Sequence, residues 1–248
     1  MYLWKCWLDT KLKFLITLGL FLCLQLAFLF SSKQTRGTVN AAQLHNGFLI
    51  VLVVISSALL FVGWILGDEN AGADIGRGSG DFLLTRPCPR GSLVWTGWMV
   101  GMVETIALWI LFSAIVLADL FFQARQWGFS ASVLLSSWGS FLKLDLPILF
   151  LIFLINLGSI YGLTYCLGII TRSGSRALIG SAALVLGYVI LKAVLLHRFH
   201  IALPELLLFY SHSDHRWEIP PVPSFVIRGA IALAFPVLAH VVLERTEI

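Results

Sequence analysis

Few residues of this sequence could take part in chemistry, and three of them are acids in or near long apolar runs. They are Glu104, Asp119 and Asp145. A carboxyl group inside a membrane is costly, so it is by default a candidate for pairing with a base or contacting a substrate. Asp119 and Asp145 fall near run ends, where we expect water to reach them and their role to be structural. Glu104 lies about three turns inside its run, where a structural role and a substrate contact are both open.

Basic and metal-ligating side chains are equally sparse. Lys192 lies near the end of another apolar run, where a lysine can extend its ammonium group toward water or line a substrate seam. His212 and His215 could share one helical turn as metal ligands, but a loop at a membrane surface tolerates histidine without metal. The four cysteines are widely spaced and form no Cys-x-x-Cys pair. We therefore predict neither a metal site nor a disulfide.

No nucleotide-binding or catalytic motif is present in the sequence. Without a Gly-x-x-x-x-Gly-Lys-Ser/Thr loop to hold phosphates, the chain is not expected to hydrolyse ATP by itself. It also lacks His-Glu-x-x-His and Gly-x-Ser-x-Gly. An integral membrane enzyme would show clustered catalytic residues, and a secondary transporter would show internal repeats and broken helices. Neither pattern is found, so both readings are disfavoured.

The elements that position these residues must be membrane helices. The chain has 248 residues, of which 58% are hydrophobic and 12% charged, whereas a soluble domain is about 45–50% apolar and about 25% charged. Apolar runs long enough to cross a bilayer predict six helices, and the alternation of a membrane barrel is absent. The runs are Phe14–Phe30, Gly47–Gly67, Leu93–Phe122, Leu144–Ile170, Ala177–Leu196 and Phe225–Leu243. The first exceeds the usual core of a signal peptide and no cleavage site follows it, so we predict a span.

Lysine and arginine are more frequent in loops on one side, which predicts the orientation of the spans. Both termini, residues 68–92 and the turn at 171–176 then lie in the cytoplasm, and the protein lies in the cell's inner (plasma) membrane. The segments 31–46, 123–143 and 197–224 face outward. The net charge of +4 suggests anionic lipid headgroups rather than nucleic acid as a neighbour.

Residues 1–13 precede the first span and are predicted to form an interfacial helix. Trp4 and Trp7 recur with leucines at helical spacing, while Lys5 and Asp9 lie on another face. Tryptophan at the headgroup level and lysine toward water are typical of a helix lying flat on the cytoplasmic leaflet. The alternative is a simple positively charged anchor for the first span.

The loop 68–92 contains a short amphipathic element with its own start and stop signals. A capping residue precedes an apolar triplet, and a proline that cannot continue a helix follows. A helix this short is marginal in water, so it needs the ends of the spans or a protein partner to rest on. The alternative is a loop that dips its leucines into lipid. The element comprises Ser79, Asp81, Phe82, Leu83, Leu84, Arg86, Pro87 and Arg90.

The outer segment 197–224 carries two further signals. A stretch that begins with a proline and continues with apolar residues, 204–210, predicts a short half-inserted helix. Pro220, Pro221 and Pro223 predict a stiff, extended entry to the last span.

The run from Asp74 to Arg90 resembles the cytoplasmic loop of ABC transporter permeases of the type-2 (ABC-2) exporter family. That loop typically reads as an acid, Gly-Thr, Phe-Leu-Leu, Arg-Pro and a further Arg before a span, and here Ser79 stands for the threonine. The turn Thr171–Ala177 is similar to the small basic turn between the family's fourth and fifth spans. The number of spans, the N-terminal helix and the hairpin before the last span also fit, so the resemblance covers the whole chain.

The resemblance implies a fold and a set of partners. The fold is an all-α membrane protein in which residues 1–248 form one permease domain with six spans, an N-terminal interfacial helix, a cytoplasmic coupling helix and an outer half-inserted helix. Such permeases pair with a second copy or a paralogous permease, and each docks one ATPase subunit. ATP and Mg²⁺ would lie on that ATPase, so this chain itself is expected to hold no cofactor.

The resemblance also assigns roles to residues. Gly78 to Arg90 would form the coupling helix in a groove of the ATPase, and Tyr2 to Lys13 would make a second contact. Spans one, two and five would line the substrate seam, and the segment before span six would close its outer end. The ATPase contacts would be Ser79, Asp81, Phe82, Leu83, Leu84, Arg86 and Arg90 in the coupling helix, and Trp4, Lys5, Trp7 and Asp9 in the N-terminal helix.

The expected function is thus an exporter permease that receives work from a separate ATPase. The alternative is an ABC-2-like membrane anchor or mechanical coupler that transports nothing. The apolar character of the spans makes a lipid-like or amphipathic cargo the default expectation.

Overall fold

The computed structural model describes most of the helical part of the chain. It describes residues 7–8, 10–20, 22–23, 41–68, 90–126, 139, 143, 145–201, 207, 211–213, 216–218 and 220–245. Three predictions therefore fall outside the described residues: the contacts of Trp4, Lys5 and Asp9, the coupling element before Arg90, and most of the half-inserted helix at 204–210.

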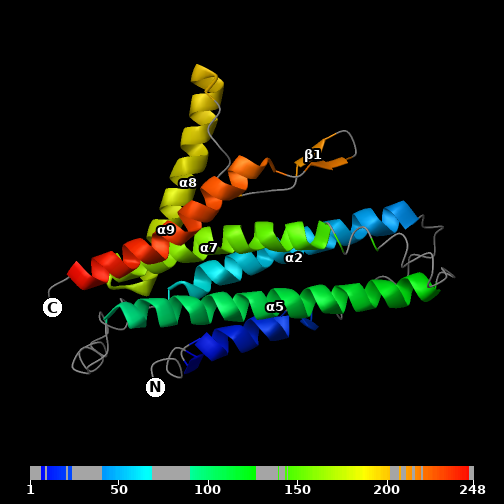
Figure 1. Ribbon diagram of the computed structural model, residues 1–248, viewed down its shortest axis with the longest axis horizontal. Helices are drawn as coiled ribbons and strands as arrows, with labels where there is room; N and C mark the ends of the chain where they lie inside the picture. Colours follow the sequence, from blue (N-terminus) through cyan, green and yellow to red (C-terminus); the bar gives the residue numbers. More distant parts are fainter. Residues whose placement is uncertain are drawn as a thin grey trace.

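The described chain is α-helical apart from one small hairpin, which agrees with the predicted all-α class (Figure 1). Residues 10–20 are helical without a break, so no interruption marks the predicted boundary between interfacial helix and first span at Lys13. The remaining elements are α2 (Ala41–Leu66), α5 (Arg90–Gln126), α7 (Leu146–Thr171), α8 (Gly174–Phe199), β1 (Ser211–Ser213), β2 (Arg216–Glu218) and α9 (Val222–Arg245).

Within the described residues, four helices are long and apolar enough to cross a membrane, which indicates a membrane-embedded protein. They are Gly91–Asp119, Leu146–Thr171, Gly174–Phe199 and Val222–Arg245, and Val51–Leu66 is a shorter apolar helix. Each of these five overlaps one of the predicted apolar runs, because the backbone of a long apolar run in a bilayer can satisfy its hydrogen bonds as a helix.

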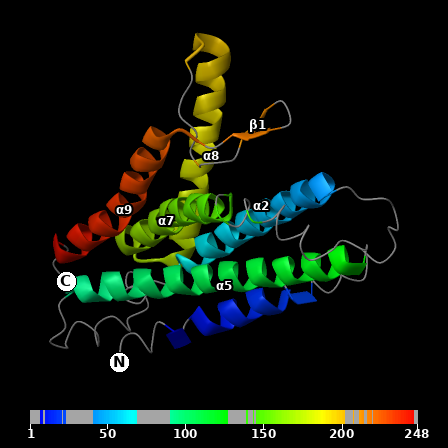
Figure 2. The same cartoon turned by 45° about the vertical axis from the view of Figure 1, so that its right-hand side comes forward.

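The core of the bundle is built around α7, which packs against α2, α8 and α9, while α5 packs against α2 and α9. Figures 1 and 2 show the N-terminal helical segment lying alongside α5. The side chains of Phe153, Leu157, Tyr161 and Tyr165 of α7 are almost fully buried. These residues lie three or four positions apart, so one face of α7 supplies much of the core.

Glycines allow the close packing of α7 against α9. A Cβ atom on Gly158 would lie 3.0 Å from the Cβ of Ala232, and one on Gly162 would lie 3.0 Å from the Cβ of Phe235. The spacing Gly158-x-x-x-Gly162 therefore serves packing within the bundle, since larger side chains would hold the two helices apart.

A second glycine pair receives two tyrosines. The hydroxyl of Tyr161 donates a hydrogen bond to the carbonyl oxygen of Gly97 at 3.1 Å, and that of Tyr165 donates to the carbonyl oxygen of Val94 at 2.8 Å. A Cβ on Gly101 would lie 2.7 Å from Cζ of Tyr161. The pair Gly97 and Gly101 thus admits tyrosine rings from α7 onto the backbone of α5.

α8 is the exception to this packing. It stands away from the other helices in Figures 1 and 2, and its buried residues are Gly174, Ala177 and Ser181, all in its first two turns. The indole nitrogen of Trp64 donates to the hydroxyl of Ser181 at 2.7 Å. The rest of α8 is mostly exposed, so the predicted six-helix bundle is not closed within the described part of one chain.

The segment before α9 differs from the prediction. β1 and β2 form an antiparallel pair in which His212 lies opposite Trp217. His212 is therefore in a strand, and the idea that it shares a helical turn with His215 is wrong. α9 already begins at Val222, so Pro223 lies in the first helical turn, where proline's missing N–H costs nothing.

Candidate functional site

The clearest polar contact of the molecule fixes the end of α2. Asp68 follows α2 directly, at the start of the predicted coupling loop, and its Oδ1 lies 2.5 Å from Nζ of Lys13. The Lys13 and Asp68 side chains are 28% and 17% exposed. This partial burial strengthens an ion pair relative to one at a fully exposed surface. The N-terminal helical segment is thereby tied to the point where the loop begins.

The turn between α7 and α8 packs on the same residue. α7 ends at Thr171, and Arg172 adopts a left-handed conformation with φ of 53°. A Cβ on Gly174 would lie 2.9 Å from the backbone oxygen of Asp68. Only glycine allows this approach, so the predicted small turn rests directly against the start of the loop.

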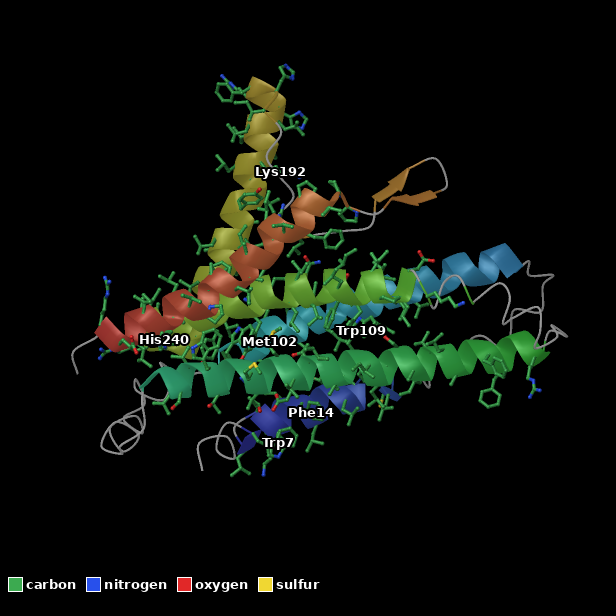
Figure 3. The ribbon with its side chains drawn as sticks, in the orientation of Figure 1. Trp7, Phe14, Met102, Trp109, Lys192 and His240 are labelled. Carbon is green, nitrogen blue, oxygen red and sulfur yellow. The ribbon has the colours of Figure 1, made fainter. Side chains whose placement is uncertain are left out.

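The other end of the loop is held by α9. A Cβ on Gly91, at the start of α5, would lie 2.6 Å from Nδ1 of His240. Nε2 of His240 lies 3.4 Å from Oε1 of Glu244, one turn further along α9. Figure 3 labels His240 near the end of α9 where α5 begins. The imidazole ring therefore packs on the backbone at the point where the loop returns to the bundle.

We call Lys13, Asp68, Gly91, Gly174 and His240 the loop anchor. It consists of two separate groups of contacts. Asp68 after α2 contacts Lys13 of the N-terminal segment and Gly174 of the α7–α8 turn, and Gly91 at the start of α5 contacts His240 near the end of α9. The loop anchor can transmit a displacement of the loop to the helices, because both ends of the loop are packed against rigid elements.

Glu104 forms the second polar contact of the N-terminal segment. Its side chain is 5% exposed, as is Thr10. The Thr10 hydroxyl donates a hydrogen bond of 2.5 Å to Oε1 of Glu104. The other carboxyl oxygen, Oε2, is buried without a hydrogen-bond partner among the described residues. The contact pins the N-terminal segment to the middle of α5, so the described geometry gives Glu104 a packing partner.

Trp7, a predicted ATPase contact, lies on the N-terminal segment (Figure 3). Its ring meets Phe14 edge-on, with centroids 5.7 Å apart, two helical turns further along. Arg90, at the end of the predicted coupling element, is the first residue of α5.

Lys192, the other intramembrane candidate, is far from Glu104. It lies on the outer part of α8, well away from the bundle (Figure 3), and the structure does not bring the two together.

Two acids differ from each other in their surroundings. Asp145 is the residue preceding α7 and is partly exposed, as expected. Asp119 is 9% exposed, so the expectation that water reaches its side chain is wrong.

Ser56 of α2 serves helix packing, because its hydroxyl accepts a hydrogen bond from the indole nitrogen of Trp109 at 2.9 Å.

Sequence reasoning missed Thr10 and His240. Their contacts join residues far apart in the chain, and neither lies in a recognisable motif. Gly91 and Gly174 at the starts of two helices were a usable signal, since glycine is a poor helix former that is often retained for close approach. Among the described residues no group of three metal-ligating side chains is found.

No family model, curated protein or solved structure matches the chain.

Proposed function

We propose that this chain is the membrane permease subunit of an ATP-driven ABC-2-type transporter, with export as its direction. Its support is the resemblance of residues 74–90 and 171–177 to that family, together with the apolar helices that indicate a membrane protein. ATP would be hydrolysed by a separate ATPase subunit on the cytoplasmic side.

The loop anchor is the observation that carries the proposal. A coupling helix can move a substrate pathway only if both of its ends are mechanically connected to the spans. Asp68 contacts Lys13 and Gly174, and Gly91 contacts His240, so both ends have such connections. A force applied by an ATPase to the loop would reach α2, α5, α8 and α9 together.

The exposed part of α8 supports a second permease as partner. Large apolar side chains along it are about half exposed, including Leu186, Ile190 and Leu191. Under the proposal, this fifth span faces the seam between two permeases, where cargo would pass. Acyl chains of membrane lipids would cover what the partner leaves open.

The experiment compares two versions of the coupling loop in the complex purified from membranes. Leu83→Asp with Leu84→Asp removes the apolar contact, whereas Leu83→Ile with Leu84→Ile preserves it as the matched control. We expect the Asp pair to lose the co-purifying ATPase and the ATP turnover that depends on it, and the Ile pair to retain both. A complex without an ATPase, or full turnover in the Asp pair, would refute the proposal.

The same preparation separates transport from anchoring. A transporter's ATP turnover should rise when amphipathic candidate substrates are added to the reconstituted complex. A chain that only anchors the ATPase would support turnover that no substrate changes.

A further inference from the structure

α9 carries an arginine on its buried face. The buried residues of α9 are Arg228, Ala232, Pro236, Ala239 and Leu243, a stripe with helical spacing that packs toward the rest of the bundle. Arg228 is 8% exposed. It stands at the position where the pattern would place an apolar residue, so its charge needs an explanation.

No hydrogen bond or ion pair of Arg228 is found among the described residues, and its nitrogens are not among the described polar atoms that are fully buried without a partner. The guanidinium group therefore reaches the surface of the bundle, where a group from outside can contact it. Arginine stays charged in proteins. A buried charge without a partner is strongly unfavourable, and arginine within a span typically pairs with an acid, a backbone carbonyl or a group outside the helix. An anion from outside the described chain would satisfy it.

The depth of Arg228 in the span limits the source of that anion. It lies six residues after Val222, the first residue of α9, which is about 9 Å along the helix axis. The 24 residues of α9 reach about 36 Å, against a hydrocarbon core of about 30 Å. The Arg228 backbone then lies about 6 Å below the headgroup region, within reach of an extended arginine side chain.

The surroundings on α9 are suited to acyl chains. Ile227 is 58% exposed and Ile231 42%, and at about 100° per residue both lie to the same side of Arg228 around the helix. A molecule with an anionic head and apolar tails would satisfy the charge and cover these side chains together. Inorganic phosphate would satisfy the charge alone.

We propose that Arg228 binds the phosphate of a phospholipid headgroup, in the leaflet where α9 begins, with acyl chains lying over Ile227 and Ile231. The forked donors of a guanidinium match phosphate oxygens in two parallel hydrogen bonds. The site needs only that α9 spans the membrane, so it is independent of the proposed transport function.

The test measures how lipids change the unfolding temperature of the full-length protein in a nonionic detergent. The probes are phosphatidylglycerol, a diacylglycerol with the same chains but no phosphate, and inorganic phosphate. Arg228→Gln removes the charge, and Arg198→Gln, at an exposed arginine in the last turn of α8, is the matched control. We expect phosphatidylglycerol alone to stabilise the wild type and Arg198→Gln. Arg228→Gln should need about tenfold more of it for the same shift.

Several results would overturn the proposal. An equal response of Arg228→Gln and wild type would remove Arg228 from the site. A full shift with diacylglycerol would assign the effect to apolar contact, and one with inorganic phosphate would assign it to a simple anion. If Arg228→Gln does not fold, Arg228→Lys keeps the charge but loses the fork, and it must bind phosphatidylglycerol more weakly than wild type.

The competing partner is an acid of the chain's own outer segment. Glu205→Gln, Asp214→Asn and Glu218→Gln each remove one candidate. If one of them destabilises the protein and its effect vanishes in the Arg228→Gln background, the arginine pairs with that carboxylate instead of a lipid.

Discussion

Single side chains decide how closely the helices of this protein approach. Tyr161 and Tyr165 fill the space above Gly97 and Gly101 and bond to the backbone of α5. The spacing of these glycines in the sequence places both on one helical face, which is typical of close helix packing. It could not name the tyrosines, since their hydrogen bonds span about 65–70 residues of chain and depend on the register of two helices.

The hydrogen bond between Thr10 and Glu104 makes a prediction at this scale. Thr10→Ala removes the donor and leaves the second oxygen of a buried carboxyl without a partner. We expect a loss of about 1–3 kcal/mol in the free energy of unfolding, measured by denaturant titration in detergent.

The matched control is Thr17→Ala, which lies about two helical turns after Thr10 in the same segment. The Thr17 hydroxyl bonds only to the backbone oxygen of Lys13 at 2.8 Å in the described structure, so its loss should cost about 0.5 kcal/mol or less. Equal losses for the two variants would mean that the Thr10 contact contributes nothing of its own. Glu104→Gln, which retains an acceptor oxygen, should be milder than Thr10→Ala.

At the scale of elements, long apolar runs were easy to predict and short irregular ones were not. Five predicted runs overlap α2, α5, α7, α8 and α9, because a run of about 20 apolar residues is long enough to cross a bilayer as a helix. β1 and β2 have three residues each. A strand of three residues is too short to show alternation, so the hairpin left no periodic signal.

Among the described helices that could span a membrane, α8 is the one least covered by other residues of the chain. Only 6% of its span is buried, against 50% for the span in α5. A cysteine at Ile190, which is 55% exposed on α8, should cross-link to a second permease in native membranes. Cysteine at Ile110, 55% exposed on α5, is the control, because the third span is not expected to line the seam. The chain's four native cysteines would first be replaced by serine.

The measurement is the fraction of chain that shifts to a covalent dimer on a gel after treatment with a short thiol cross-linker. We expect Ile190→Cys to cross-link several times more than Ile110→Cys. Equal yields would indicate random collision in the membrane, and the partner assigned to α8 would have to be abandoned.

For the whole molecule, the sequence predicted the class and the order of helices but not their assembly. The apolar composition and the positions of the apolar runs were sufficient to predict the class and the order of the helices. The loop anchor needed the structure, because it depends on contacts between distant segments: Lys13 and Gly174 contact Asp68, and His240 contacts Gly91. The separation of α8 also depends on packing preferences that no single run contains.

The orientation of the whole chain can be tested with reporter fusions. Alkaline phosphatase fused after Phe199, the end of α8, should be active, because that enzyme matures only outside the cytoplasm. Fused after Arg245, the end of α9, it should be inactive, while green fluorescent protein at that position should fluoresce. The opposite pattern would reverse the predicted topology, and phosphatase activity at both positions would mean that α9 does not cross the membrane.

The separation of α8 from its sequence neighbours has a consequence for biogenesis. α9 packs against α7, although α8 is made between them. During synthesis α8 must therefore leave the side of α7 that α9 will occupy, and within the described residues most of its length stays exposed. If the proposed second permease covers α8, a copy without that partner would stay incompletely packed. Cells continually degrade incompletely folded protein, so the supply of the partner would then set how much of this protein a cell retains.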